Sequence, residues 1–363
     1  MARLARRCDP DRAEAALRAI AARADAADRG CASLDRDLAA LRDAGLLEAL
    51  ERACLPGGDT AAAVALLRRL GRVSLPVGRL VEGHLNALRL VAVYGTPDQR
   101  ARVGVQGGQV APVLGVWGAD GAPPVRIAET VGSRLRLTGS KRFCSGLGIV
   151  SRAVVTAADA TGAPQMVLAD VRDPARADPG DWQVSGMRAT LSGGFDFEGV
   201  LAEPLGAPGD FLREPHFEGG IWRYLALKTG AIEALAEAVR ARIAGKPEGG
   251  GELDQARLMK AVAAAHTARM WTEAAAAAAE APGADAGAIP LVLTARESVE
   301  GCAQEVLGIA DRALGTAGFR QGCPADLLRR DLSFYLRQAD LDGKLRRAAR
   351  ATLNHARPVG EQW

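Results

Sequence analysis

Aromatic side chains are scarce in this chain of 363 residues, which has 7 Phe, 5 Trp and 3 Tyr. Proteins that hold single-stranded nucleic acid usually combine aromatic platforms with clustered basic residues. Here 46 Lys and Arg are nearly balanced by 43 Asp and Glu, so the formal net charge is only +3. The composition therefore gives no support for a protein that binds nucleic acid.

Long apolar segments are also lacking. A membrane-spanning helix needs on the order of 20 consecutive apolar residues, and charged residues interrupt every apolar run of this chain well before that length. Residues 1–7 are basic, and charged, amphipathic sequence follows them where a signal peptide would be apolar. We therefore expect no membrane insertion, and we expect the chain to begin with the first helix of a cytoplasmic protein.

The cysteines and histidines show no metal-binding or disulfide pattern. The chain has no CxxC motif and no close Cys/His spacing, so neither a zinc site nor a disulfide framework is predicted. Reduced thiols in the cytoplasm are the expectation for all six cysteines. These residues are Cys8, Cys31, Cys54, Cys144, Cys302 and Cys323, and the four histidines are His84, His216, His266 and His355.

Helical spacing of apolar residues dominates the first part of the chain. It runs through residues 11–50, about 60–72 and 79–94. Gly95 is predicted to end the third of these stretches, and a new helix is then predicted with Thr96 as N-cap and Pro97 as its first residue.

From about residue 111 the pattern changes to alternation. Leu135 and Leu137 alternate with polar neighbours, and short apolar strands are separated by glycine- and proline-containing turns. This spacing predicts a small antiparallel barrel or sandwich.

Helices are predicted again from about residue 216. The clearest periodicity steps by 3 and 4, which is typical of the seam of a helical bundle. Its members are Val292, Ala295, Val299, Cys302, Val306 and Ile309. The chain is thus predicted to be an α+β protein with a helical N-terminal domain (1–110), a small β-domain (111–212) and a C-terminal four-helix bundle (213–358).

Two motifs give this order a more specific meaning. One is Gly-Ser-Lys-Arg-Phe-Cys-Ser-Gly at 139–146; the other combines Leu-Gly-Thr at 314–316 with the Arg-Asp pair inside 328–335. Together they resemble the acyl-CoA dehydrogenase family over about residues 30–345. The resemblance implies FAD as cofactor, an acyl thioester of CoA or a carrier protein as substrate, and a homodimer or homotetramer. It leaves the electron acceptor open.

The resemblance also implies cofactor-binding residues. Val116 and Trp117 match the strand that contacts the flavin through its backbone, and Phe143, Cys144 and Ser145 match the segment that covers the ring. A ring that stacks and a hydroxyl that bonds a flavin nitrogen suit this chemistry. The alternative is a strand with one packed Phe and a turn Ser. Trp117 is expected either to stack where the family has a hydrogen-bonding Thr or to fill the space left by a missing cofactor. Gly315 and Thr316 match the family's glycine-rich contact near the adenosine.

The catalytic base departs from the family pattern. At position 339, where these dehydrogenases usually carry Glu, the chain has Ala, and Asp340 is beside it. Asp340 or Glu218 is then the candidate base, and an N-cap is the alternative role for Asp340. Arg330 and Asp331 are expected to form a structural ion pair or cap.

The leading functional prediction is α,β-dehydrogenation of an acyl thioester with FAD. The alternatives are a hydroxylase of the same fold that uses reduced flavin and oxygen, and a non-catalytic family member that acts as a binding or partner subunit.

Overall fold

The N-terminal part of the protein is helical. The computed structural model describes residues 9–104, 112–180, 182–337 and 340–362, so Cys8 and the basic residues 1–7 lie outside the described part. The predicted capping at Thr96 is confirmed: its Oγ1 accepts from the Gln99 backbone N–H at 3.2 Å, and Gln99 Oε1 accepts from the Thr96 N–H at 2.9 Å. The helices are α1 (Pro10–Asp28), α2 (Asp35–Asp43), α3 (Leu46–Cys54), α4 (Thr60–Gly71), α5 (Leu75–Tyr94) and α6 (Pro97–Arg102).

The middle of the chain forms the β-domain. Its strands are β1 (Leu114–Trp117), β2 (Arg126–Val131), β3 (Arg134–Thr138), β4 (Ser140–Cys144), β5 (Arg152–Ala158), β6 (Pro164–Asp170), β7 (Ala177–Asp178), β8 (Gly193–Asp196) and β9 (Leu201–Leu205). One sheet has the order β1-β5-β2-β3-β9-β6 and closes on itself, because β6 also pairs with β5; β4, β8 and β7 form a second sheet. The predicted antiparallel pairing is found for most strand pairs, and the exceptions are the parallel pairs of β5 with β1 and β2.

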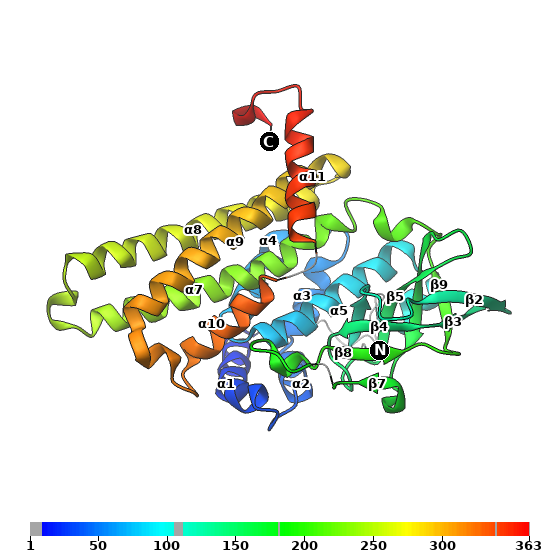
Figure 1. Ribbon diagram of the computed structural model, residues 1–363, viewed down its shortest axis with the longest axis horizontal. Coiled ribbons are helices and arrows are strands. Elements are labelled where there is room, and N and C mark those ends of the chain that lie inside the picture. Colours follow the sequence, from blue (N-terminus) through cyan, green and yellow to red (C-terminus); the bar gives the residue numbers. More distant parts are fainter. Residues whose placement is uncertain (1–8, 105–111, 181, 338–339, 363) are drawn as a thin grey trace.

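The C-terminal part is again helical, which confirms the predicted α+β class. The helices are α7 (Trp222–Ala244), α8 (Glu252–Ala279), α9 (Ile289–Leu314), α10 (Pro324–Tyr335) and α11 (Leu341–Leu353). In Figure 1 the long helices α7, α8 and α9 extend away from the β-domain, and α5 runs between the two regions. The seam from Val292 to Val306 is buried, and α9 packs against α7 and α8 of the same chain. The seam is therefore internal and is not available as a subunit interface.

The two helical regions share one hydrophobic core. A single cluster of buried side chains joins helices α1 to α5 with α7 to α11. α4 and α7 cross closely, because a Cβ on Gly71 would lie 2.1 Å from the Leu227 carbonyl oxygen and one on Gly230 would lie 2.1 Å from the Arg68 carbonyl oxygen. Only glycine fits at these two positions. The N-terminal helices are thus not an independently packed domain.

Among the described helices, none combines the length and the hydropathy needed to cross a lipid bilayer.

Candidate functional site

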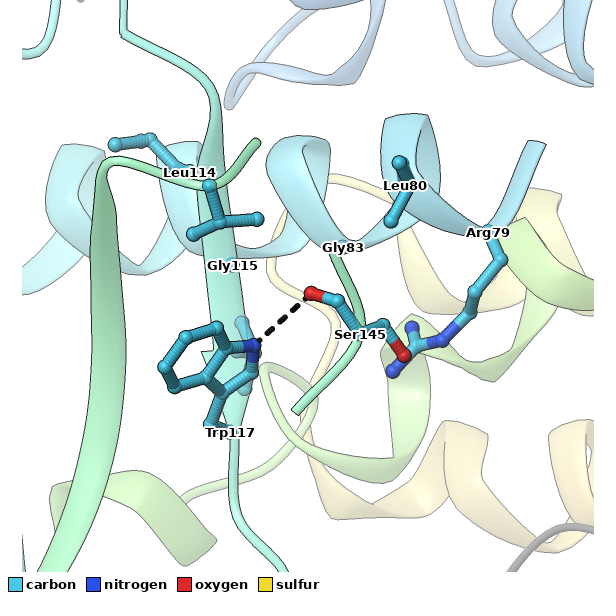
Figure 2. Close-up of a pocket in the computed structure, with 9 residues that line it drawn as sticks. Arg79, Leu80, Gly83, Leu114, Gly115, Trp117 and Ser145 are labelled. Carbon is cyan, nitrogen blue, oxygen red and sulfur yellow. Dashed lines mark hydrogen bonds between the residues drawn. The ribbon is translucent and has the colours of Figure 1, made fainter. Parts of the chain in front are cut away.

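Two pockets open along one face of α5, where this helix packs against β1. Arg79, Gly83, Asn86 and Leu90 follow one another at helical spacing and contribute to the pockets in pairs. The first, here called the β1 pocket, has about 200 Å³ of empty volume, part of it open to solvent. Its lining comprises Arg79, Leu80, Gly83, Leu114, Gly115, Val116, Trp117, Ser145 and Val150. Figure 2 shows Trp117 and Ser145 on its β-domain side.

A histidine attaches β1 to α5. Nδ1 of His84 accepts a hydrogen bond from the Leu114 backbone N–H at 3.1 Å, and its Nε2 lies 2.9 Å from Glu51 Oε1 on α3. Because the Nδ1 atom accepts, the Nε2 atom carries the proton and donates to Glu51. The first residue of β1 is therefore fixed against the helix that lines both pockets.

A buried lysine fixes the segment that follows β1. Lys141 is only 1% exposed, and its Nζ donates to the Gly118 carbonyl oxygen, to Asp120 Oδ1 at 2.6 Å and to Thr156 Oγ1 at 3.0 Å. Burial lowers the pKa of Lys141, while the bond to Asp120 opposes this change. The lysine of the 139–146 motif thus has a structural role that the sequence did not reveal.

Three of the predicted cofactor-binding residues meet in the β1 pocket: Val116, Trp117 and Ser145. The Trp117 indole Nε1 donates to the Ser145 carbonyl oxygen at 3.2 Å (Figure 2), and its ring lies 5.4 Å from the ring of Phe195. Trp117 is 2% exposed. Trp117 is therefore packed in the β-domain core, and its role toward a flavin stays a prediction.

Phe143 and Cys144 point to opposite faces of β4. Phe143 is 55% exposed, with a φ of 56°, and the Arg142 guanidinium lies 5.0 Å from its ring centroid. Its ring also meets Trp182 edge-on at 6.5 Å. Cys144 is fully buried, and burial raises the pKa of its thiol to about 12. The Cys144 side chain therefore lies in the core of the β-domain, whereas Phe143 offers a ring at the surface, and the predicted cofactor contact of Cys144 stays a prediction.

The Ser145 hydroxyl is the end of a chain of hydrogen bonds. Ser192 Oγ donates to Ser145 Oγ at 2.8 Å, and Thr190 Oγ1 lies 2.7 Å from Ser192 Oγ. Thr190 Oγ1 in turn donates to the Met187 carbonyl oxygen at 2.8 Å, and the Met187 N–H donates to Asp331 Oδ1 at 2.6 Å. This hydroxyl chain connects the β1 pocket to α10.

The Arg330–Asp331 pair expected from the sequence does not form. Arg330 instead bonds Asp28 at 2.9 Å and Asp326 at 2.9 Å, and donates to the Ser185 carbonyl oxygen. Asp331 is 2% exposed, and burial raises its pKa to about 7. Both residues hold the 185–187 segment onto α10, so they are structural, as predicted, but through other partners.

Gly315 and Thr316 lie in a turn at the end of α9. In Figure 1 this turn is at the end of the helical bundle remote from β4. Within one chain, the residues expected near the adenosine are therefore not brought to Phe143 and Ser145.

Asp340 is poorly suited to be a catalytic base. Its side chain is 54% exposed and pairs with Arg347 at 2.8 Å, and this bond lowers the pKa of the carboxyl group. A base needs the opposite shift, which a dry pocket provides. Asp340 occupies the N-cap position of α11, but its side chain makes no capping bond. Glu218 is buried and pairs with Arg347. Position 339 is outside the described residues.

The second pocket, here called the arginine pocket, was not predicted. It has about 510 Å³ of empty volume, part of it open to solvent. It is lined by Asn86, Arg89, Leu90, Val116, Phe211, His216, Phe217, Gly220 and Arg223. These residues come from α5, β1, the 206–221 segment and α7, and no sequence motif joins them.

The comparisons place this fold among known proteins. The protein has the acyl-CoA dehydrogenase-like fold. It superposes on FMN-bound TdsC from Paenibacillus sp. A11-2 with a TM-score of 0.78, 19% identity and 96% and 98% of the two chains covered. For methanesulfinate monooxygenase MsuC from Pseudomonas fluorescens the TM-score is 0.75, with 18% identity and 98% and 99% covered.

Sequence comparison finds similarity over part of the chain. Dibenzothiophene monooxygenase from Rhodococcus erythropolis is 26% identical over 249 residues, which are 59% of this chain and 58% of that protein. The chain thus matches little more than half the length of this curated relative. No family model matches the sequence.

Proposed function

We propose that the protein is a flavin-dependent monooxygenase. In this reaction, reduced flavin supplies two electrons to O₂, so that one oxygen atom enters the substrate and the other leaves as water. The similarity to dibenzothiophene monooxygenase and the likeness in fold to methanesulfinate monooxygenase support this proposal over dehydrogenation of an acyl thioester. This is the hydroxylase alternative considered from the sequence.

One observation carries the choice. Among the described residues that line the two pockets, none is Asp or Glu. Dehydrogenation of an acyl thioester needs a carboxylate or another base beside the substrate to take the α-proton. Asp340, the carboxylate nearest the missing Glu in sequence, is exposed and ion-paired. Oxygen insertion makes no such demand for a carboxylate.

The flavin is proposed to be FMN. The residues that would hold its ring are the β1 backbone at Val116, the Ser145 hydroxyl and the exposed ring of Phe143. Gly83 leaves room on the facing helix, because a Cβ there would meet only Arg79 Nη1, at 3.8 Å. FAD is less well supported, since the TdsC neighbour is described with FMN.

A second copy of the chain is proposed to complete the flavin site. The β1 pocket has room for only about 10 Å³, roughly one water molecule, whereas ligand pockets usually measure roughly 300–1,000 Å³, so one chain alone does not enclose a flavin ring. Phe143 remains largely exposed beside it. A homodimer or homotetramer in which the second copy covers Phe143 would enclose the flavin ring. Light scattering with and without FMN tests this arrangement.

Binding and turnover test the proposed function at one residue. Gly83→Leu fills the β1 pocket, whereas Gly83→Ala adds one methyl group in ordinary van der Waals contact with Arg79 and favours the helix by roughly 0.5–1 kcal/mol. We expect FMN to raise the melting temperatures of the wild type and of Gly83→Ala, and to leave the melting temperature of Gly83→Leu unchanged. With a flavin reductase and NADH to supply reduced FMN, the wild type and Gly83→Ala should incorporate oxygen into the substrate, and Gly83→Leu should not. A wild-type protein that binds neither FMN nor FAD would refute the proposal and favour a non-catalytic role.

A further inference from the structure

The arginine pocket has two chemically different sides. One side is apolar and comprises Leu90, Val116, Phe211 and Phe217, whose two phenyl rings lie 4.9 Å apart. The other side is cationic or polar, with Arg89, Arg223, His216 and Asn86. A ligand that fits both sides has an apolar group and a group that accepts hydrogen bonds from guanidinium.

The cationic side is short of negative charge. Glu280 is the carboxylate that pairs with both arginines: its Oε2 is 2.6 Å from Arg89 Nη2, and its Oε1 is 2.8 Å from Arg223 Nη2. Glu280 Oε1 also accepts from the Trp222 indole. Two guanidinium groups thus share one carboxylate in a site where Arg223 is 1% exposed. A buried charge is costly unless it is paired, so one further negative charge would be stabilised here.

Two polar atoms in this wall have no hydrogen-bond partner within the described protein. They are Nε of Arg223 and Nδ1 of His216, and both atoms are buried. Both atoms are closed off from the pocket in this structure, so they mark unmet hydrogen-bonding capacity in its wall, worth about 1–3 kcal/mol each, which a small shift of the wall would direct to a ligand. Burial, together with the charge of Arg89, lowers the pKa of His216. The imidazole is therefore neutral at pH 7, and its Nδ1 can donate or accept.

The arginine pocket adjoins the β1 pocket. Val116 lines both, and Gly83 of one pocket lies less than one helical turn from Asn86 of the other. An anion held by Arg89 and Arg223 would place its apolar part against Val116. That part would then lie next to the residues proposed to hold the flavin ring.

We propose that the arginine pocket binds the substrate, and that the substrate is a small organic anion, a carboxylate, sulfinate or sulfonate with an apolar or aromatic group. This inference rests on the proposed monooxygenase function. It distinguishes the protein from an enzyme for a neutral sulfur heterocycle or for an apolar acyl chain, neither of which would use the buried Arg223 together with the largely covered Arg89.

A pair of probes of similar shape and different charge tests the inference. Benzenesulfonate carries the negative charge, and methyl phenyl sulfone replaces one charged oxygen by a methyl group. Titration calorimetry at constant ionic strength should show benzenesulfonate binding about tenfold or more tightly than the sulfone, a difference of about 1.4 kcal/mol. Equal affinity of the two probes, or no binding of either, would overturn the proposal.

Variants of the wall locate the binding. Arg223→Gln and Arg89→Gln should each weaken the binding of benzenesulfonate about tenfold or more. Glu280→Gln should strengthen this binding, because the arginines lose their shared carboxylate. Arg240→Gln is the matched control, since Arg240 is on the same helix as Arg223 but is exposed and paired with Glu237. If circular dichroism shows that one of the arginine variants is unfolded, the tighter binding expected for Glu280→Gln still tests the site. Unchanged affinity in all folded wall variants would contradict the site.

FMN binding measured on the same samples separates the two proposals. If the protein binds FMN but binds the anion no better than the sulfone, the proposed substrate class is refuted and the proposed monooxygenase function is not. Anion binding without FMN or FAD binding refutes the monooxygenase and, with it, the assignment of the anion as its substrate.

Discussion

Asp331 on α10 accepts a hydrogen bond from the backbone N–H of Met187 at 2.6 Å, and so connects the helical bundle to the β-domain. Close packing reinforces the contact, since a Cβ on the neighbouring Gly186 would lie 2.1 Å from the Arg330 carbonyl oxygen. From Met187 the hydroxyl chain continues through Thr190 and Ser192 to Ser145. The Ser145 hydroxyl in the β1 pocket is therefore linked through a series of close polar contacts to a carboxyl group in another part of the chain.

Removing the middle of the hydroxyl chain should weaken flavin binding without unfolding the protein. Ser192→Ala takes away the donor to Ser145, and the loss of one hydrogen bond of this kind is worth about 1 kcal/mol, or roughly fivefold in Kd. We expect this change in FMN affinity by fluorescence titration. Ser151→Ala, which also removes a half-buried hydroxyl from the β-domain, is the control. An unchanged FMN affinity in Ser192→Ala would show that the chain does not act on the cofactor.

The raised pKa of Asp331 makes stability depend on pH. The pKa of this carboxyl is about 7 in the folded protein, against the ordinary value of 3.8. Between these values the folded state keeps a proton that the unfolded state has lost, so stability falls as pH rises from 4 to 7. Asp331→Asn stays neutral, and its amide oxygen can still accept from Met187. The difference in melting temperature between the variant and the wild type should therefore increase from pH 4 to pH 8. A difference that does not change with pH would contradict the assignment of the raised pKa to Asp331.

A buried lysine in α7 should have the opposite dependence. Lys228 is 2% exposed, and its Nζ lies 4.4 Å from the Tyr224 ring centroid and 5.2 Å from that of Tyr335. Burial, with a contribution from Arg296, lowers its pKa from 10.5 to about 7. Between these values the unfolded state binds the additional proton, so stability rises with pH.

Lys228→Met tests this assignment. Met has a similar length and no charge, so the variant should be more stable than wild type at pH 6, and the difference should shrink between pH 7 and pH 10. Urea unfolding at several pH values measures this difference in the free energy of unfolding. Lys260→Met, an exposed position on α8, should show no such trend.

Asp340→Asn should change little. The carboxyl is exposed and its pKa is lowered by Arg347, so it does not act as a base and contributes little to folding. FMN binding, oxygen incorporation and melting temperature should equal those of wild type. A large loss of turnover with unchanged FMN affinity would restore Asp340 as a catalytic group and reopen the dehydrogenase prediction.

Local chemistry explains what could be predicted from the sequence. The cap at Thr96 and the seam of α9 depend on residues close together in the chain, and both are found in the structure. The burial of Cys144 does not follow from simple alternation. β4 is irregular between Lys141 and Cys144, and Phe143 has a φ of 56°, so Lys141 and Cys144 are both buried while Arg142 and Phe143 are both exposed. Regular alternation would instead place Phe143 on the face of Lys141, so this irregularity could not be predicted from the sequence pattern.

The arginine pocket could not be found in this way. Arg89, His216 and Arg223 lie on separate segments, and each alone looks like an ordinary charged or polar residue. Their common feature, a shortage of negative charge around buried guanidinium groups, exists only after α5 and α7 have packed together.

The crossing of α4 and α7 at Gly71 and Gly230 has a consequence for biosynthesis. While the ribosome is still translating the β-domain, α4 has no α7 to pack against, and the apolar residues Leu67 and Leu70 lack their final neighbours. Contacts between such distant segments slow folding, and surfaces exposed during the delay favour aggregation. Nascent chains that end before α7 should therefore be held by chaperones and be sensitive to protease, and they should become resistant only once the second glycine has left the exit tunnel.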